Sequence, residues 1–237
     1  MGAGRDALNG AVARAWQVLD LPVPATTGVC VNCCLDPQIE ADFLNHSARD
    51  LPAAYVRDWY FAAYSPDLRF AQMGWLLPRV MQMLAEGEEV TNLGLEVVLA
   101  RLPLAGFPDA WPRDAVQAVR DFAHAYLVTA CAEEGTEPLD EVLCMIGESG
   151  LPIGDFLADL DRLADDTLAD MLHRSWVVDW GGKIPLSPFW STDTSRAAVW
   201  GWYTSPELYK RMMRAAENGN AQASAVAGAI ARVWDQP

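Results

Sequence analysis

Three of the five cysteines lie within five consecutive positions, and their type and spacing point most directly to chemistry. Cys30, Cys33 and Cys34 come just before a predicted helix start at Asp36. Two thiolates at C-x-x-C spacing bind one soft metal ion such as zinc, or form a redox pair. The third cysteine would then be a further ligand or a resolving thiol. The alternative is that all three are ordinary packed cysteines.

A tetrahedral metal site on this cluster needs a fourth ligand from elsewhere in the chain. His46, Cys131 and Cys144 carry side chains of the right type. None of them stands at a spacing that forms the second half of a known zinc motif with the cluster. The sequence therefore predicts either a metal site completed from a distance or a thiol pair.

A second group of candidate ligands falls on a helix predicted over residues 152–173. At 100° per residue Asp159, Asp166, Asp170 and His173 share one face of that helix. Two carboxylates and an imidazole presented together bind divalent cations in helical bundles. The competing interpretation is a solvated acidic face, with His173 well placed at the helix C-terminus.

Ten tryptophans are many for a chain of 237 residues. Five of them fall in one stretch that also holds two adjacent glycines and two prolines: Trp176, Trp180, Trp190, Trp200 and Trp202. Aromatic side chains around such a loop form a pocket for a flat or cationic ligand, or a patch for a protein partner. They also serve as the core of a region without regular structure.

The charge balance limits the classes of partner. The chain has 32 acidic and 17 basic residues, a formal net charge of −15. An acidic surface repels phosphate backbones and anionic lipids, so the sequence argues against nucleic-acid and membrane partners and favours a basic partner. No apolar run reaches the length of a membrane span and no signal peptide is recognised, which predicts a cytoplasmic protein with reduced thiols.

Helix-start signals and apolar periodicity cover nearly the whole chain. Helices are expected over residues 6–19, 36–44, 55–63, 65–87 with an interruption at Pro78, 92–102, 111–130, 138–146, 152–173, 192–204, 205–219 and 220–234, with a structured loop over 175–191. No alternating apolar-polar run argues for a sheet. The predicted fold is all-α, an irregular stack of roughly ten helices arranged as helical hairpins or a superhelical array. A single domain over 1–237 is expected, with division into 1–134 and 138–237 as the alternative.

Short motifs in the N-terminal half resemble an uncharacterised family of bacterial all-helical proteins. The similar stretches are Cys33-Cys34-Leu35-Asp36-Pro37, Arg49-Asp50-Leu51-Pro52, Leu77-Pro78-Arg79 and residues 87–102. The resemblance implies a helical fold and carries no activity, cofactor or partner with it.

The function predicted from the sequence follows mainly from what is missing. No complete catalytic constellation is recognised, so we expect a non-enzymatic protein that binds another macromolecule through its acidic surface and its tryptophans. The alternative is a metal-binding or thiol-redox protein that uses Cys30, Cys33 and Cys34. A third hypothesis is an enzyme with a divalent cation at Asp166, Asp170 and His173.

Overall fold

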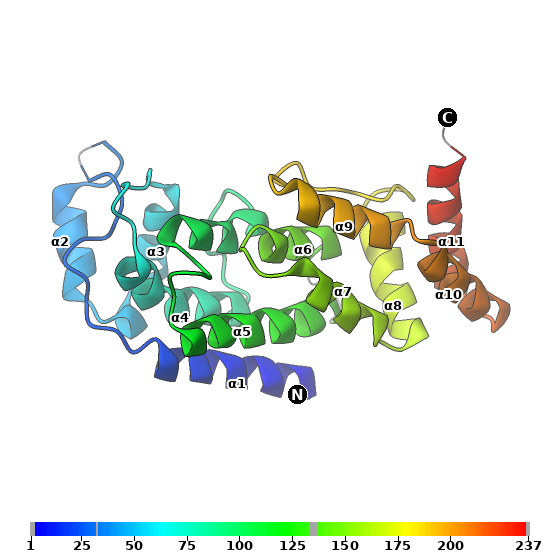
Figure 1. Ribbon diagram of the computed structural model, residues 1–237, viewed down its shortest axis with the longest axis horizontal. Helices are drawn as coiled ribbons and strands as arrows, with labels where there is room; N and C mark the ends of the chain where they lie inside the picture. Colours follow the sequence, from blue (N-terminus) through cyan, green and yellow to red (C-terminus); the bar gives the residue numbers. More distant parts are fainter. Residues whose placement is uncertain (1–2, 32, 133–136, 236–237) are drawn as a thin grey trace. The chain divides into compact units, whose positions relative to one another are not determined.

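The computed structural model describes residues 3–31, 33–132 and 137–235, and it builds them almost entirely from helices (Figure 1). This described part contains eleven α-helices, three 3-10 helices and one π-helix, and its only β-structure is an isolated bridge between Val29 and Tyr64. The all-α prediction is confirmed. None of the helices in the described ranges is both long and apolar enough to cross a bilayer.

The chain divides into two compact units, which are described separately. Unit 1 comprises Met1–Tyr126 with Ser149–Leu151, and unit 2 comprises Leu127–Glu148 with Pro152–Pro237. The division thus falls inside α5 (Arg113–Ala132), between Tyr126 and Leu127. The division expected from the sequence lies about eight residues later, and its first boundary, at 134, is outside the described residues.

Unit 1 is organised around the apolar helix α4. Its elements are α1 (Ala3–Val18), α2 (Pro37–Asn45), η1 (Ala48–Asp50), α3 (Ala53–Phe61), α4 (Phe70–Glu86), η2 (Leu95–Val97), η3 (Leu99–Ala105) and the first part of α5. Helix α1 packs against α4, and η1 and η3 also contact α4. The interruption expected at Pro78 does not split α4, because the residues on both sides of the proline are buried and hold the helix in the core.

Unit 2 contains shorter helices than expected from the sequence. They are α6 (Leu139–Gly147), α7 (Ile153–Asp161), α8 (Asp165–Leu172), the π-helix η4 (His173–Val178), α9 (Asp193–Tyr203), α10 (Pro206–Glu217) and α11 (Ala221–Trp234). The single helix predicted over 152–173 is wrong, since the chain breaks between α7 and α8. Arg211 of α10 stabilises the break by donating to the carbonyl oxygens of Asp161 and Leu163 and to the carboxylate of Asp165.

Two buried carboxylates at α6 hold the loop that leads into α9. Glu148 accepts hydrogen bonds from the backbone N–H groups of Ser191 (3.0 Å) and Thr192 (2.8 Å), and from both of their hydroxyls. Asp140 accepts from the backbone N–H of Ser187 and faces Nε1 of Trp190. Because these donors lie more than forty residues from their acceptors, the loop is ordered by tertiary contacts.

Candidate functional site

The cysteine cluster stands on a buried segment that is anchored to two helices. Thr27 is 2% exposed, and both its N–H (3.0 Å) and its hydroxyl (2.7 Å) donate to the same carboxylate oxygen of Glu40 in α2. The indole N–H of Trp59 in α3 donates to the carbonyl oxygen of Thr27 at 2.9 Å. Hydrogen bonds to a charged acceptor are stronger than neutral ones, so this segment is firmly held.

The next three residues pair with the segment that follows α3. Gly28 has φ +76°, a left-handed conformation that favours glycine, and a Cβ there would come within 2.8 Å of Leu68 Cδ1. Its carbonyl accepts from Ser65 N–H (3.0 Å), and Cys30 N–H donates to the carbonyl oxygen of Ala63 (2.7 Å). The backbone is therefore fixed up to Cys30.

Buried aromatic rings support this pairing from below. Trp59 is 1% exposed, and its ring centroid lies 5.2 Å from that of Tyr64 and 5.1 Å from that of Tyr60. The guanidinium of Arg101 covers the Tyr64 ring at 4.3 Å. Burial raises the pKa of Tyr60 and of Tyr64 well above the ordinary value, so both rings stay neutral up to strongly alkaline pH.

The three sulfur atoms meet at the surface above this base. Cys30 and Cys33 form a disulfide with their Cα atoms 6.1 Å apart, and Cys34 Sγ lies 3.2 Å from Cys33 Sγ. Cys30 is half-buried, whereas Cys33 and Cys34 are exposed. The fully reduced cluster expected from the sequence is not what the structure contains. The turn closed by Leu35 N–H on the Cys30 carbonyl (3.1 Å) brings the two Cα atoms within disulfide range.

As metal ligands, these cysteines form a group of three. Their sulfur atoms lie within 4.8 Å of one another, which suits a shared soft ion once the disulfide is reduced. Among the proposed fourth ligands, His46 uses Nδ1 for a contact with the Asp42 carbonyl (2.8 Å), and Cys144 is buried in α6 of unit 2. The side chain of Cys131 is outside the described part of the chain. Within the described residues, no further His, Cys, Asp or Glu ligand atom joins this group of three.

The proposed acidic site in unit 2 is not assembled as a cation site. Asp166, Asp170 and His173 are not among the described groups whose ligand atoms approach within 4.8 Å of one another. Asp166 accepts from the side-chain amide of Asn220 at 2.7 Å, and Asp170 lies 3.5 Å from the guanidinium of Arg174. Asp159 belongs to the preceding helix α7 and pairs with Arg162.

The five tryptophans of the 176–202 stretch are divided between core and surface. Trp176 (0% exposed) and Trp190 (8% exposed) are buried, and the Trp190 ring lies against Gly147. Trp200 and Trp202 are half-buried, and Trp202 Nε1 donates to Asp161 at 2.9 Å. Trp180 is 53% exposed. Two of the five residues expected to form a patch therefore serve the core instead.

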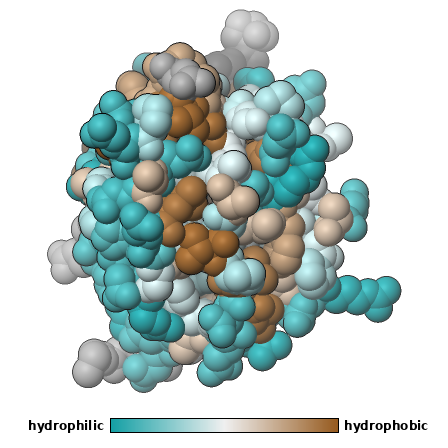
Figure 2. All heavy atoms as spheres, turned by 90° about the vertical axis from the view of Figure 1, so that its left-hand side faces the viewer, coloured by the Kyte–Doolittle hydropathy of each residue, from teal (hydrophilic) through white to brown (hydrophobic). Residues whose placement is uncertain are grey.

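A large apolar side chain is exposed close in sequence to the backbone partner of Cys30. Phe61, at the end of α3, is 68% exposed, and it lies two residues before Ala63, the backbone partner of Cys30. Figure 2 looks onto the end of the molecule that carries α2 in Figure 1, and it shows apolar residues exposed among hydrophilic ones.

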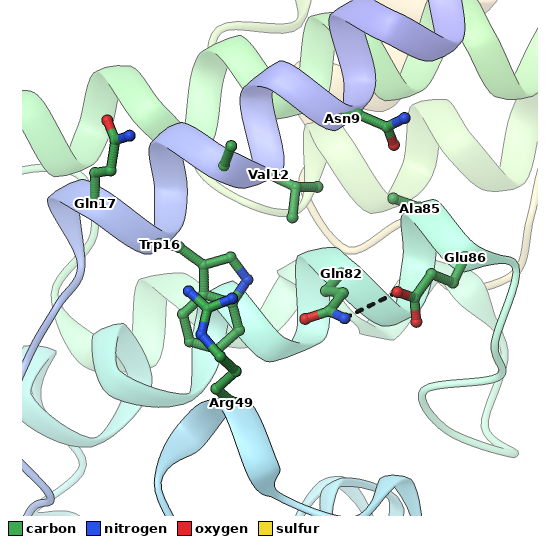
Figure 3. Close-up of a pocket in the computed structure, with 9 residues that line it drawn as sticks. Asn9, Val12, Trp16, Gln17, Arg49, Gln82, Ala85 and Glu86 are labelled. Carbon is green, nitrogen blue, oxygen red and sulfur yellow. Dashed lines mark hydrogen bonds between the residues drawn. The ribbon is translucent and has the colours of Figure 1, made fainter. Parts of the chain in front are cut away.

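Sequence reasoning missed a pocket in unit 1, between α1, η1 and α4. It has a volume of about 460 Å³, and its walls include Val12, Trp16, Arg49, Gln82, Ala85 and Glu86 (Figure 3). These residues come from three separate elements and form no sequence motif. No local pattern in the sequence therefore indicates the pocket.

Comparison with known proteins gives no relative: no protein-family model, no curated protein and no solved structure matches the chain. The resemblance to an uncharacterised bacterial family therefore stays a prediction, and the function has to be argued from the site.

Proposed function

We propose that Cys30, Cys33 and Cys34 form a thiol–disulfide exchange site. The observation that carries this proposal is an exposed Cys33 sulfur that is bonded to Cys30 and lies 3.2 Å from the sulfur of Cys34. An accessible disulfide with a neighbouring thiol is the arrangement that exchange requires, because the reaction proceeds by attack of a thiolate on a disulfide sulfur.

The exchange is written as a two-electron reduction of the protein by a dithiol. One substrate thiolate attacks Cys33 Sγ, the more exposed sulfur, and the bond to Cys30 breaks. Cys30 leaves as a thiolate and takes up the proton released by the substrate. The second substrate thiol then attacks the mixed disulfide, which releases Cys33 as a thiol and the substrate as a disulfide.

Cys34 gives the site a second route out of the mixed disulfide. Its sulfur lies next to Cys33 Sγ, so its thiolate would attack the mixed disulfide and release a substrate that has only one thiol. The product would be a disulfide between the adjacent residues Cys33 and Cys34. Phe61, which is exposed two residues before the backbone partner of Cys30, favours a polypeptide substrate over a small hydrophilic thiol.

The test is a thiol count by mass spectrometry after alkylation, combined with a trapping variant. In the oxidised protein Cys34 is expected to be the only one of the three to react, and reduction is expected to add Cys30 and Cys33. The double variant Cys30→Ser, Cys34→Ser should retain a polypeptide disulfide on Cys33, while Cys33→Ser in the same background should retain none.

Elemental analysis of the reduced protein distinguishes exchange from metal binding. About one zinc per chain, lost on replacing any of the three cysteines, would contradict the exchange proposal and support the thiolate metal site. Metal-free protein with a reversible disulfide supports exchange.

A second candidate function, binding of a basic protein partner, is favoured by exposed apolar residues in unit 2. Three large apolar side chains are exposed at the end of η4 and on the segment that leads to α9, in a chain of net charge −15: Val178 (65%), Trp180 (53%) and Phe189 (47%). A photo-crosslinking residue at Trp180 should crosslink to a basic protein when it is irradiated at low salt, and the yield should fall when it is irradiated at high salt. The same residue at Met213, which is also exposed in unit 2, is the matched control.

A further inference from the structure

The pocket in unit 1 is separate from the cysteine site in the residues it uses and is large enough for a small ligand. Its volume of about 460 Å³ falls in the range of small-molecule sites. Val12 and Ala85 provide apolar wall, whereas Arg49 and Glu86 bring opposite charges to the same pocket. A pocket that combines apolar wall with a few charged groups orients a ligand that carries matching charges.

Arg49 is the cation of this pocket and pairs with an aromatic ring. Its guanidinium lies 4.2 Å from the centroid of the Trp16 ring. Within the described residues it has no carboxylate partner, although the chain has 32 acidic and only 17 basic residues. Stacking fixes the plane of the guanidinium and leaves its N–H edge for an oxyanion.

Gln82 and Glu86 form the opposite, electron-rich part of the lining. Gln82 Nε2 donates to Glu86 Oε1 at 2.8 Å, which fixes the amide so that its oxygen faces the side of Trp16 and Arg49 (Figure 3). That oxygen is buried and accepts no hydrogen bond in the described part of the chain. Arg79 approaches Glu86 only at 3.9 Å and is shared with Glu88, so Glu86 keeps acceptor capacity.

We propose that this pocket binds an elongated zwitterion, such as a short peptide or an ω-amino acid, with its carboxylate on Arg49 and its ammonium group on Glu86. The net negative charge of the protein would repel a dianion. A simple cation would be repelled by Arg49 and would give its guanidinium no anionic partner. A molecule with both charges matches both ends of the pocket.

The separation of the two ends sets the length of the ligand. Glu86 lies one helical turn beyond Gln82, about 6 Å along α4, and Arg49 lies on the other side of Gln82 in the view of Figure 3. The two charges of a single α-amino acid are too close together to bridge that span. A dipeptide or a longer ω-amino acid carries its two charges further apart, as the proposal requires.

The test is calorimetric titration of the full chain with matched probes. L-alanyl-L-alanine should bind. Its N-acetyl and C-amide forms have each lost one charge, so each should bind with an affinity lower by a factor of about ten or more. Among glycine, γ-aminobutyrate and ε-aminocaproate the affinity should rise with length. The proposal is overturned if none of these zwitterions binds, or if the N-acetyl form binds as well as the free dipeptide.

Four variants assign the binding to the pocket. Arg49→Gln and Glu86→Gln should each weaken the dipeptide about tenfold or more. Glu88→Gln removes the same charge and disturbs the same arginine outside the pocket, and Arg14→Gln removes an exposed arginine of α1 that does not line it. These two controls should leave the affinity unchanged, and an equal loss in the controls would overturn the assignment.

Discussion

Reduction of the Cys30–Cys33 disulfide should cost little stability, because the bond closes a very short loop. The two cysteines are separated by three positions. The loop-closure relation for four residues gives an entropy of about 6 cal/mol/K, or about 2 kcal/mol at 25 °C. For a chain of this length that corresponds to a fall in Tm of about 4–8 °C.

The hydrogen bonds below the cluster should matter at least as much as the disulfide. Thr27→Val keeps the shape of the buried side chain and removes the 2.7 Å hydrogen bond to the Glu40 carboxylate. A hydrogen bond to a charged group contributes about 1.5–3 kcal/mol. The variant should therefore unfold within a few degrees of the reduced wild type.

The assay is thermal unfolding followed by circular dichroism, with and without a reductant that does not absorb. The double variant Cys30→Ser, Cys34→Ser is the control, since it should unfold like the reduced wild type and show no further response to reductant. A fall in Tm of more than about twice the expected range on reduction would refute the reasoning. The disulfide would then be a structural cross-link, unsuited to reversible exchange.

Three further predictions concern the packing of each unit. Glu148→Gln should lower the free energy of unfolding by about 1–3 kcal/mol in urea titrations, because four donors lose a charged acceptor; an unchanged midpoint would contradict this. Gly147→Ala places a Cβ within 2.6 Å of the Trp190 ring and should cost about 1–3 kcal/mol, whereas Gly154→Ala, with open space around it, should be neutral or stabilising. Burial raises the pKa of Tyr60 in the folded state. Above about pH 10 the unfolded chain therefore loses a proton that the folded protein keeps. The free energy of unfolding should fall there by up to about 1.4 kcal/mol per pH unit. Tyr60→Phe should make this alkaline fall less steep in unfolding measured at a series of pH values, and equal slopes would count against the assignment.

The sequence predicts helix starts well where the signal is local. Asp36 before Pro37 and Ser205 before Pro206 cap α2 and α10 as expected, with each side chain accepting a backbone N–H. Ser65 carries the same pattern, but there its hydroxyl accepts from Asp67 N–H in a turn, and α4 begins only at Phe70. A cap and a turn share the same first hydrogen bond, so the local pattern alone does not distinguish them.

Breaks that depend on distant residues could not be predicted in this way. The segment from 152 to 173 has helical periodicity throughout, and nothing between α7 and α8 is a proline or a glycine. The break is stabilised by Arg211, which is about fifty residues further along the chain. The residues around the break carry the helix propensity of the segment. They do not include Arg211, the donor that hydrogen-bonds to the carbonyl groups at the break.

The cysteine site could be predicted from the sequence and the pocket could not, and the reason for this difference is physical. Cys30, Cys33 and Cys34 are neighbours in sequence, so one turn is enough to bring their sulfur atoms together. Arg49 and Trp16 have no special feature in the sequence. They come together because α1 and η1 both pack on α4, and this packing places the Arg49 guanidinium over the Trp16 ring, opposite the acidic end of α4. Chemistry built on spacing is therefore visible in the sequence, whereas chemistry built on packing appears only once the helices are placed. The zwitterion titration tests chemistry built on packing directly, because its outcome depends on Arg49 and Glu86, which the sequence alone gives no reason to pair.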